Sequence, residues 1–129
     1  MTNYFGGRAK LIELGRAADE RGTLAPFYFD QMPFIPRRAF VVNNVPVGTT
    51  RGQHALRVGT QMLVCVHGRI DVLMRYGTTE ASVIMTRDSG GLLLGCGVWA
   101  QQTYVTDGSS LLVFCSSPFD PAAYIRNVS

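Results

Sequence analysis

The strongest constraint on the fold is that apolar residues occur in short runs and never with the sustained periodicity of a helix. No segment keeps apolar residues at i, i+3 and i+4 over three turns, whereas runs rich in Val, Ile, Leu and aromatic residues recur between Gly, Pro, Asn and Asp. This pattern predicts an all-β barrel or sandwich. We expect strands of ordinary length at residues 38–43, 61–67, 69–75, 81–86, 92–94, 101–106 and 110–115.

Three turn signals separate neighbouring strands. They are His67-Gly68, residues 76–79 and Asp107-Gly108, which contain residue types that tolerate the positive φ of tight hairpins. We therefore expect successive strands to pair antiparallel. Loops are predicted at residues 33–36, 45–50 and 117–121, and a short helical turn at 122–126.

The strands differ in how many of their faces are apolar. In strand 69–75, Ile70, Val72 and Met74 alternate with mostly polar residues, which predicts one buried and one solvated face. Residues 62–66 and 111–114 are apolar without interruption, as expected where a second sheet or a second subunit covers both faces. In so small a chain, such strands predict a homodimer.

Length and composition narrow the possible classes of protein. The chain has 129 residues, so residues 1–129 are expected to form a single domain. Charged residues make up 16% and hydrophobic residues 47%, which argues against disorder and against a nucleic-acid-coating surface. The net charge of +3 is spread along the chain and suits an anionic small molecule at least as well as a polyanion. No apolar run approaches a membrane span and no signal-peptide pattern is visible, so we expect a cytoplasmic protein.

Cysteines and histidines give no metal-site pattern. Cys65, Cys96 and Cys115 lie in apolar segments, without C-x-x-C spacing and without a nearby partner histidine, and are expected to be buried free thiols. With His54 and His67 as the only histidines, a histidine-rich metal centre is not expected.

The segment at residues 49–57 is the candidate for chemistry. An imidazole such as that of His54 can take or return a proton near neutral pH. Arg51 could hold a phosphate or a carboxylate, and Arg57 adds a second positive charge. From spacing alone, a polar strand-end histidine satisfied by a backbone group is the better interpretation. The pattern by itself therefore leaves the function open.

An ordered series of segments carries a family resemblance. It comprises residues 19–24 (DERGTL), Pro33-Phe34 followed by Arg38, residues 51–55 (RGQHA), residues 61–68 (QMLVCVHG), Gly91-Leu92, Val98-Trp99 and residues 124–126 (YIR). Over residues 14–126 the chain resembles the sugar nucleotide 3,4-ketoisomerases, cupin-type enzymes acting on dTDP-4-keto-6-deoxyglucose. The resemblance implies a double-stranded β-helix (cupin jelly-roll barrel), a domain-swapped or intimately paired homodimer, no metal or cofactor, and a barrel pocket for a nucleotide-linked keto sugar.

The resemblance also implies roles for individual residues. These enzymes move a carbonyl between neighbouring carbons by proton transfer through an enediol-type intermediate. His54 matches the catalytic histidine of the family motif R-G-x-H-A-H-K, and Arg51 matches the arginine expected to face the pyrophosphate or sugar. Arg21 matches a residue that helps to determine the face on which the proton is returned. Further substrate-binding candidates are Gln53, Arg57, Gln61, Trp99, Gln101 and Tyr104, with Gln102 as another polar residue that could enter the pocket.

The chain departs from the family pattern at polar positions of the pocket. Leu56 replaces the second motif histidine, Arg57 the lysine and Phe40 a tyrosine, and Ala100 stands where a histidine or arginine is frequent. Leu, Phe and Ala cannot donate or accept a proton. The first expectation is a cofactor-independent isomerase with His54 as base. The alternatives are a divergent cupin that isomerises or cyclises a less polar small molecule in specialised-metabolite biosynthesis, or a non-catalytic ligand-binding homologue.

Overall fold

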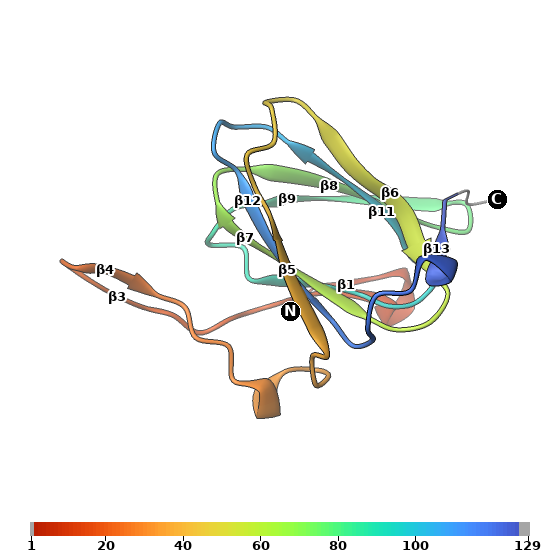
Figure 1. The fold of residues 1–129 in the computed structure, drawn as a ribbon, viewed down its shortest axis with the longest axis horizontal. Helices are drawn as coiled ribbons and strands as arrows, with labels where there is room; N and C mark the ends of the chain where they lie inside the picture. Colours follow the sequence, from red (N-terminus) through yellow and green to blue (C-terminus); the bar gives the residue numbers. More distant parts are fainter. Residues whose placement is uncertain (1, 127–129) are drawn as a thin grey trace.

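The computed structural model describes residues 2–126, and antiparallel strands make up nearly all of its regular structure (Figure 1). The helical segments of this range are single-turn 3-10 helices: η1 (Phe5–Gly7), η2 (Phe29–Gln31) and η3 (Pro121–Ala123). Within the same range, no helix is long and apolar enough to span a membrane. The expected all-β architecture is confirmed.

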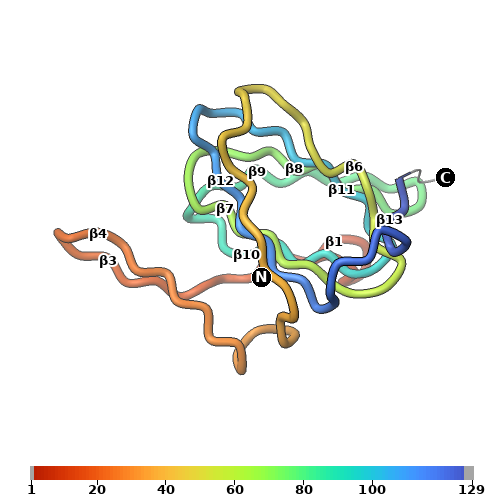
Figure 2. Tube along the Cα trace, viewed as in Figure 1, coloured from red at the N-terminus to blue at the C-terminus, as the bar shows by residue number. Residues whose placement is uncertain are grey.

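Two sheets lie face to face (Figures 1 and 2). The six-stranded sheet has the order β1 (Thr2–Tyr4), β2 (Ala9–Ile12), β10 (Gly91–Leu94), β7 (Gln61–His67), β12 (Ser110–Cys115) and β5 (Arg38–Val42). The five-stranded sheet has the order β13 (Tyr124–Ile125), β6 (Thr50–Leu56), β11 (Trp99–Tyr104), β8 (Ile70–Tyr76) and β9 (Thr79–Met85).

Most consecutive strands cross from one sheet to the other, which is the topology of a jelly roll. The expected pairing of successive strands is correct for β8 and β9, which the turn at residues 76–79 joins. It is wrong for the other two turn signals, because His67-Gly68 and Asp107-Gly108 join strands of different sheets. A tight turn fixes a change of direction, whereas the apolar faces of the strands decide which sheet each strand joins.

The core between the sheets takes one face of each strand. Ile70, Val72 and Met74 are all buried, so the predicted inner face of that strand is confirmed. From the opposite sheet, Leu63 and Cys65 of β7 enter the same cluster. The expectation of buried thiols is correct for Cys65 and Cys115 but wrong for Cys96, which is exposed in the turn before β11.

The outer face of the six-stranded sheet carries a second apolar cluster. Met62, Val64 and Phe114 are buried there under side chains of residues 27–34, including Phe27 and Phe34. One of the two apolar faces predicted for β7 and β12 thus packs in the barrel core, and the other is partly covered by residues 27–34 of the same chain. The cover ends at the hairpin of β3 (Ala17–Asp19) and β4 (Gly22–Leu24), whose residues are exposed and which projects away from the barrel (Figures 1 and 2).

The C-terminal segment differs from the expected helical turn over residues 122–126. Its 3-10 turn ends at Ala123, and Tyr124-Ile125 forms β13, which pairs with Leu56 and Ala55 of β6. The unpaired backbone groups at the edge of β6 explain the difference, because pairing satisfies more of them than an isolated turn would.

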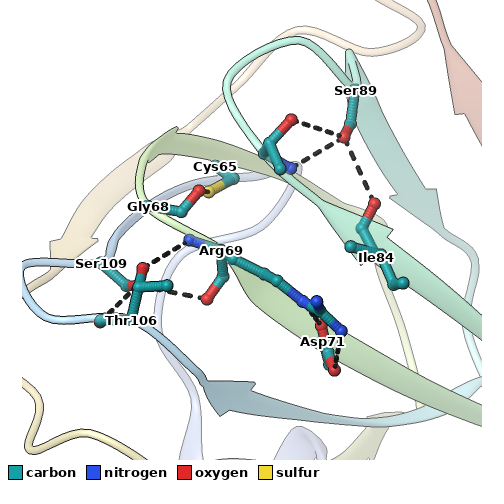
Figure 3. Close-up of polar contacts among 9 residues, drawn as sticks. Cys65, Gly68, Arg69, Asp71, Ile84, Ser89, Thr106 and Ser109 are labelled. Atoms are coloured by element: carbon teal, nitrogen blue, oxygen red, sulfur yellow. Dashed lines mark hydrogen bonds and ion pairs between the residues drawn. The ribbon is translucent and has the colours of Figure 1, made fainter.

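A hydrogen-bonded corner fixes the end of the barrel where the chain crosses between the sheets (Figure 3). The Arg69 N–H donates to Thr106 Oγ1 at 2.9 Å, and Ser109 Oγ donates to the Arg69 carbonyl at 3.2 Å. Gly68 has a φ of +79°, and a Cβ there would lie 2.4 Å from Ser109 Oγ. This corner therefore requires glycine both for its backbone conformation and for space.

Replacing this glycine tests the corner. We expect Gly68→Ala to lower the free energy of unfolding by about 3 kcal/mol, because a strained φ and a steric clash add. Gly77→Ala is the matched control: its φ is +61° with no atom within 4 Å of a Cβ, so it should cost about 1 kcal/mol. Urea unfolding measures both, and equal losses for the two variants would contradict the packing argument.

Candidate active site

A β-bulge in β6 determines which side chains enter the barrel. Arg51 pairs with Gln102 and His54 pairs with Ala100, so three steps along β6 correspond to two along β11. The extra residue is accommodated at Gly52 and Gln53, whose φ angles are +85° and +60°. A Cβ on Gly52 would lie 2.6 Å from Gln102 Oε1. Glycine at this position therefore lets the bulge pack against β11.

The bulge places Arg51 and His54 on one face of the sheet. In a regular strand, residues three apart point to opposite faces. Here Arg51 and His54 share the face of their partners Gln102 and Ala100, which are two residues apart on β11. The opposite face is marked by Thr50 and Thr103, whose hydroxyls lie 2.8 Å apart. The local backbone geometry thus brings a guanidinium and an imidazole to the same cavity.

That cavity has a volume of about 100 Å³ and lies between the two sheets. Its wall has polar and apolar parts. The polar and aromatic side chains with hydrogen-bonding groups are Arg51, His54, Gln61, Gln102, Tyr104 and Tyr124. The apolar side chains are Phe40, Val42, Leu63, Leu111 and Val113. A mostly apolar pocket with a few converging polar groups is typical of a small-molecule site.

His54 is held by an aromatic stack. Its ring lies parallel to that of Tyr124, with 4.5 Å between centroids and 3° between planes. Arg38 donates a long hydrogen bond of 3.4 Å to the Tyr124 hydroxyl and lies 4.5 Å above the Phe40 ring. Burial, with a smaller contribution from the positive charge of Arg126, lowers the pKa of His54. At neutral pH the imidazole is therefore uncharged and can accept a proton.

Tyr104 lines the same cavity and is fully buried. Its hydroxyl has no hydrogen-bond partner among residues 2–126. Burial raises the pKa of Tyr104 to about 12, although the charge of Arg51 acts in the opposite direction. The phenol is therefore protonated at neutral pH and is available as a donor.

Positive charge collects near the cavity. The acidic residues that form ion pairs lie elsewhere: Asp19 with Arg21, Asp71 with Arg69, Glu80 with Arg75 and Asp88 with Arg16. Within the described part of the chain, neither Arg51 nor Arg38 forms an ion pair with a carboxylate. No group of three or more His, Cys, Asp or Glu that could hold a metal ion lies in this range either. The site is thus suited to an anionic ligand.

The structure brings together four of the residues predicted from sequence, namely Arg51, His54, Gln61 and Tyr104. Gln102, named from sequence as a further residue that could enter the pocket, also lines the cavity, and so does Tyr124, which was not predicted there. Gln102 follows from alternation, because it shares a strand face with Tyr104. Tyr124 had no local signal as a cavity residue, since its position depends on the pairing of β13 with β6.

The other predicted residues, Arg21, Gln53, Arg57, Trp99 and Gln101, do not line the cavity. Gln101 lies on the opposite face of β11 from Gln102. Trp99 is buried, with the Arg75 guanidinium 4.8 Å from its ring centroid. Arg21 lies in the turn of the projecting hairpin and donates to Asp19. Within one chain, Arg21 is therefore separate from His54.

The lowered pKa of His54 predicts a pH dependence of stability. Between the lowered pKa of His54 in the folded protein and its ordinary value of 6.5, the unfolded protein binds more protons than the folded protein. The contribution of His54 to the free energy of unfolding is therefore fully present above pH 6.5 and is lost as the pH falls through this window. We expect the wild-type free energy of unfolding to fall more between pH 7.5 and 5.5 than that of His54→Gln. Urea titrations at both pH values measure the two losses in the free energy of unfolding. The contributions of all other titrating groups cancel when the loss of the variant is subtracted from that of wild type. Equal losses in the two proteins would contradict burial of a neutral imidazole.

Comparisons with known proteins identify the family of this chain. The chain matches the FdtA family (WxcM-like, C-terminal) over residues 7–129. It is 26% identical over 118 residues to the TDP-4-oxo-6-deoxy-alpha-D-glucose-3,4-oxoisomerase of Aneurinibacillus thermoaerophilus, covering 91% of this chain and 85% of that protein. It also resembles a mutant of the 3,4-ketoisomerase QdtA from Thermoanaerobacterium thermosaccharolyticum in complex with TDP-4-keto-6-deoxyglucose. The sequence identity to this QdtA variant is 30% and the TM-score is 0.88, and the match covers 93% of this chain and 88% of the QdtA chain.

A third relative is the TDP-quinovose 3,4-ketoisomerase WlaRB from Campylobacter jejuni. It is 29% identical to this chain with a TM-score of 0.84, and the likeness covers 92% of each chain. These relatives are all isomerases by name, and each is matched over most of its length. The chain belongs to the FdtA (WxcM-like, C-terminal) family and is similar throughout to sugar nucleotide 3,4-ketoisomerases.

Proposed function

We propose that this protein is a cofactor-independent isomerase that moves a carbonyl between neighbouring carbons of TDP-4-keto-6-deoxyglucose or a closely related nucleotide-linked keto sugar. The observation that carries the proposal is that His54 and Arg51 line one cavity inside the barrel. Two of the relatives are described by this substrate or its reaction. The alternatives of a less polar substrate or of binding without catalysis have no comparable support.

The chemistry needs a base beside an acidic carbon and a cation beside the oxygen that becomes charged. Neutral His54 accepts the proton from the carbon next to the carbonyl, because its lowered pKa keeps it unprotonated. Arg51 stabilises the enolate oxygen that forms. The proton of the neighbouring hydroxyl passes to the enolate oxygen, a new C=O bond forms at that neighbouring carbon, and His54 returns its own proton to the former carbonyl carbon, so no oxidant or reductant is needed.

The cavity is large enough for only part of a nucleotide-linked sugar. A volume of about 100 Å³ is below the 300–1,000 Å³ typical of pockets for whole ligands. Only the keto sugar enters the barrel, and the TDP group remains outside. Arg57 is exposed just after β6 and Arg126 is exposed beside Gly52, and both supply positive charge for the pyrophosphate. Contacts of Gln53, Trp99 and Gln101 with the substrate remain predictions. The cytoplasmic location also remains a prediction.

Deuterium exchange tests the proposed reaction. Incubated with TDP-4-keto-6-deoxyglucose in deuterated water, the wild-type protein should introduce deuterium next to the sugar carbonyl, as measured by mass spectrometry. We expect His54→Gln to lower this rate by about 100- to 10,000-fold, because the base is lost.

The second histidine provides a matched control. His67 is exposed at the end of β7 and does not line the cavity, so His67→Gln should exchange deuterium at the wild-type rate. A wild-type protein that exchanges no label but gains thermal stability with TDP would show binding without this reaction.

We further propose that the protein is a homodimer in which the outer face of the six-stranded sheet contacts a second copy. Val41, Leu112 and Val64 lie in register across three strands of this face. Val41 is 58% exposed, and a groove of about 650 Å³ runs between this face and the base of the projecting hairpin. The exposed apolar end of this row at Val41 and the adjoining groove are typical of an interface. The second copy would also give the hairpin with Arg21 a surface to contact.

Two matched charge substitutions test the dimer. Val41 on β5 and Ile84 on β9 are 58% and 57% exposed, and both lie on edge strands. We expect wild type and Ile84→Glu to sediment at twice the mass of one chain, and Val41→Glu to sediment as a monomer, because a buried unpaired carboxylate disfavours association. A dimeric Val41→Glu variant would place the interface elsewhere.

A further inference from the structure

The apolar side chains around His54 do not supply the acid that the proposed reaction needs. Phe40 lines the cavity, and Ala100 and Leu56 border a small void beside His54. None of these three side chains can give a proton to the carbonyl oxygen. Arg51 can stabilise negative charge, but a guanidinium does not release its proton in proteins. The acid therefore has to be one of the two phenols of the cavity wall, Tyr104 or Tyr124, and the Tyr124 hydroxyl already has a hydrogen-bond partner in Arg38.

Tyr104 is the unexplained polar group in that wall. Its side chain has 0% exposure, and its hydroxyl lacks a hydrogen-bond partner among the described residues. A buried hydroxyl without a partner destabilises the folded protein, and Phe would fill the same space without this cost. Since the surrounding fold gives the hydroxyl nothing to bond, a ligand in the cavity is its natural partner.

Tyr104 and His54 reach the same cavity from two levels of the five-stranded sheet. His54 lies beside Ala100 on the neighbouring strand, and Tyr104 is four residues further along β11 on the same inner face. At the rise of a β-strand, the Cα atoms of Ala100 and Tyr104 lie about 13 Å apart, and the side chains of His54 and Tyr104 extend from these two levels to line the same cavity of about 100 Å³. A sugar ring in this cavity would contact both side chains, with Arg51 near Tyr104, where its charge favours the phenolate.

We propose that Tyr104 is the catalytic acid that protonates the substrate's carbonyl oxygen while His54 removes the neighbouring carbon-bound proton. This inference rests on the proposed isomerase function. In the first step, the C–H electron pair forms the C=C bond of an enediol, and the carbonyl oxygen takes the phenolic proton of Tyr104.

The second step reverses these transfers on the adjacent carbon. The Tyr104 phenolate takes the proton of the neighbouring hydroxyl, a new C=O bond forms there, and His54 returns its proton to the former carbonyl carbon. Both residues end in their starting states, so no oxidant, reductant or other reactant is needed. Arg51 stabilises the phenolate between the two steps.

Tyr104→Phe tests this assignment because it removes a single oxygen atom. We expect deuterium exchange into TDP-4-keto-6-deoxyglucose to fall by about 100-fold or more, as for loss of a positioned acid. The melting temperature without ligand should rise by roughly 3 °C, because an unsatisfied buried hydroxyl is removed. Tyr76→Phe is the control: Tyr76 lies at the end of β8 and outside the cavity lining, so its exchange rate should equal that of wild type.

The possible outcomes separate this inference from the function on which it rests. If wild type exchanges deuterium and Tyr104→Phe does so equally fast, Tyr104 is not the acid and the isomerase function stands. A lower melting temperature of Tyr104→Phe would show a structural hydroxyl, bonded to buried water, and would also overturn the assignment. If wild type exchanges no deuterium, the proposed function fails and the role of Tyr104 fails with it.

Discussion

The site depends on one local irregularity, the bulge at Gly52 and Gln53. Without the extra residue, Arg51 and His54 would face opposite sides of β6, and only one of them could reach the barrel interior. Both bulge residues adopt positive φ, and Gly52 leaves the space that Gln102 occupies. The backbone conformation of these two residues therefore brings a cation and a base to the same cavity, while the remainder of the barrel holds this strand in place.

The surroundings of that pair decide which proton chemistry is possible. Burial lowers the pKa of His54, and stacking on Tyr124 fixes the plane of its ring. Apolar side chains such as Phe40 form much of the remaining cavity wall. The hydroxyl of Tyr104 and the charge of Arg51 complement them. An uncharged base and a protonated phenol at the same pH form a pair that can act on two adjacent carbons of one substrate.

Local patterns predicted the local parts of this structure. Alternation in β8 identified Ile70, Val72 and Met74 as an inner face, and the turn at residues 76–79 identified its pairing with β9. Pairing between strands distant in sequence was not predictable in this way, because turn residues do not show which sheet the next strand joins. The bulge was equally hidden, since Gln53 is an unusual residue at positive φ. His54 was identified mainly through the family motif, whereas the unsatisfied hydroxyl of Tyr104 could be recognised only once its neighbours were known.

The central claim is that the keto sugar binds inside the barrel between an imidazole and a phenol. The most direct measurement is a crystal structure of the His54→Gln variant with TDP-4-keto-6-deoxyglucose bound. We expect the sugar carbonyl to lie in the cavity within hydrogen-bond distance of the Tyr104 hydroxyl, with the adjacent carbon facing residue 54 and the TDP group outside the barrel. A sugar bound in the groove beside the projecting hairpin, with the cavity holding only water, would contradict it.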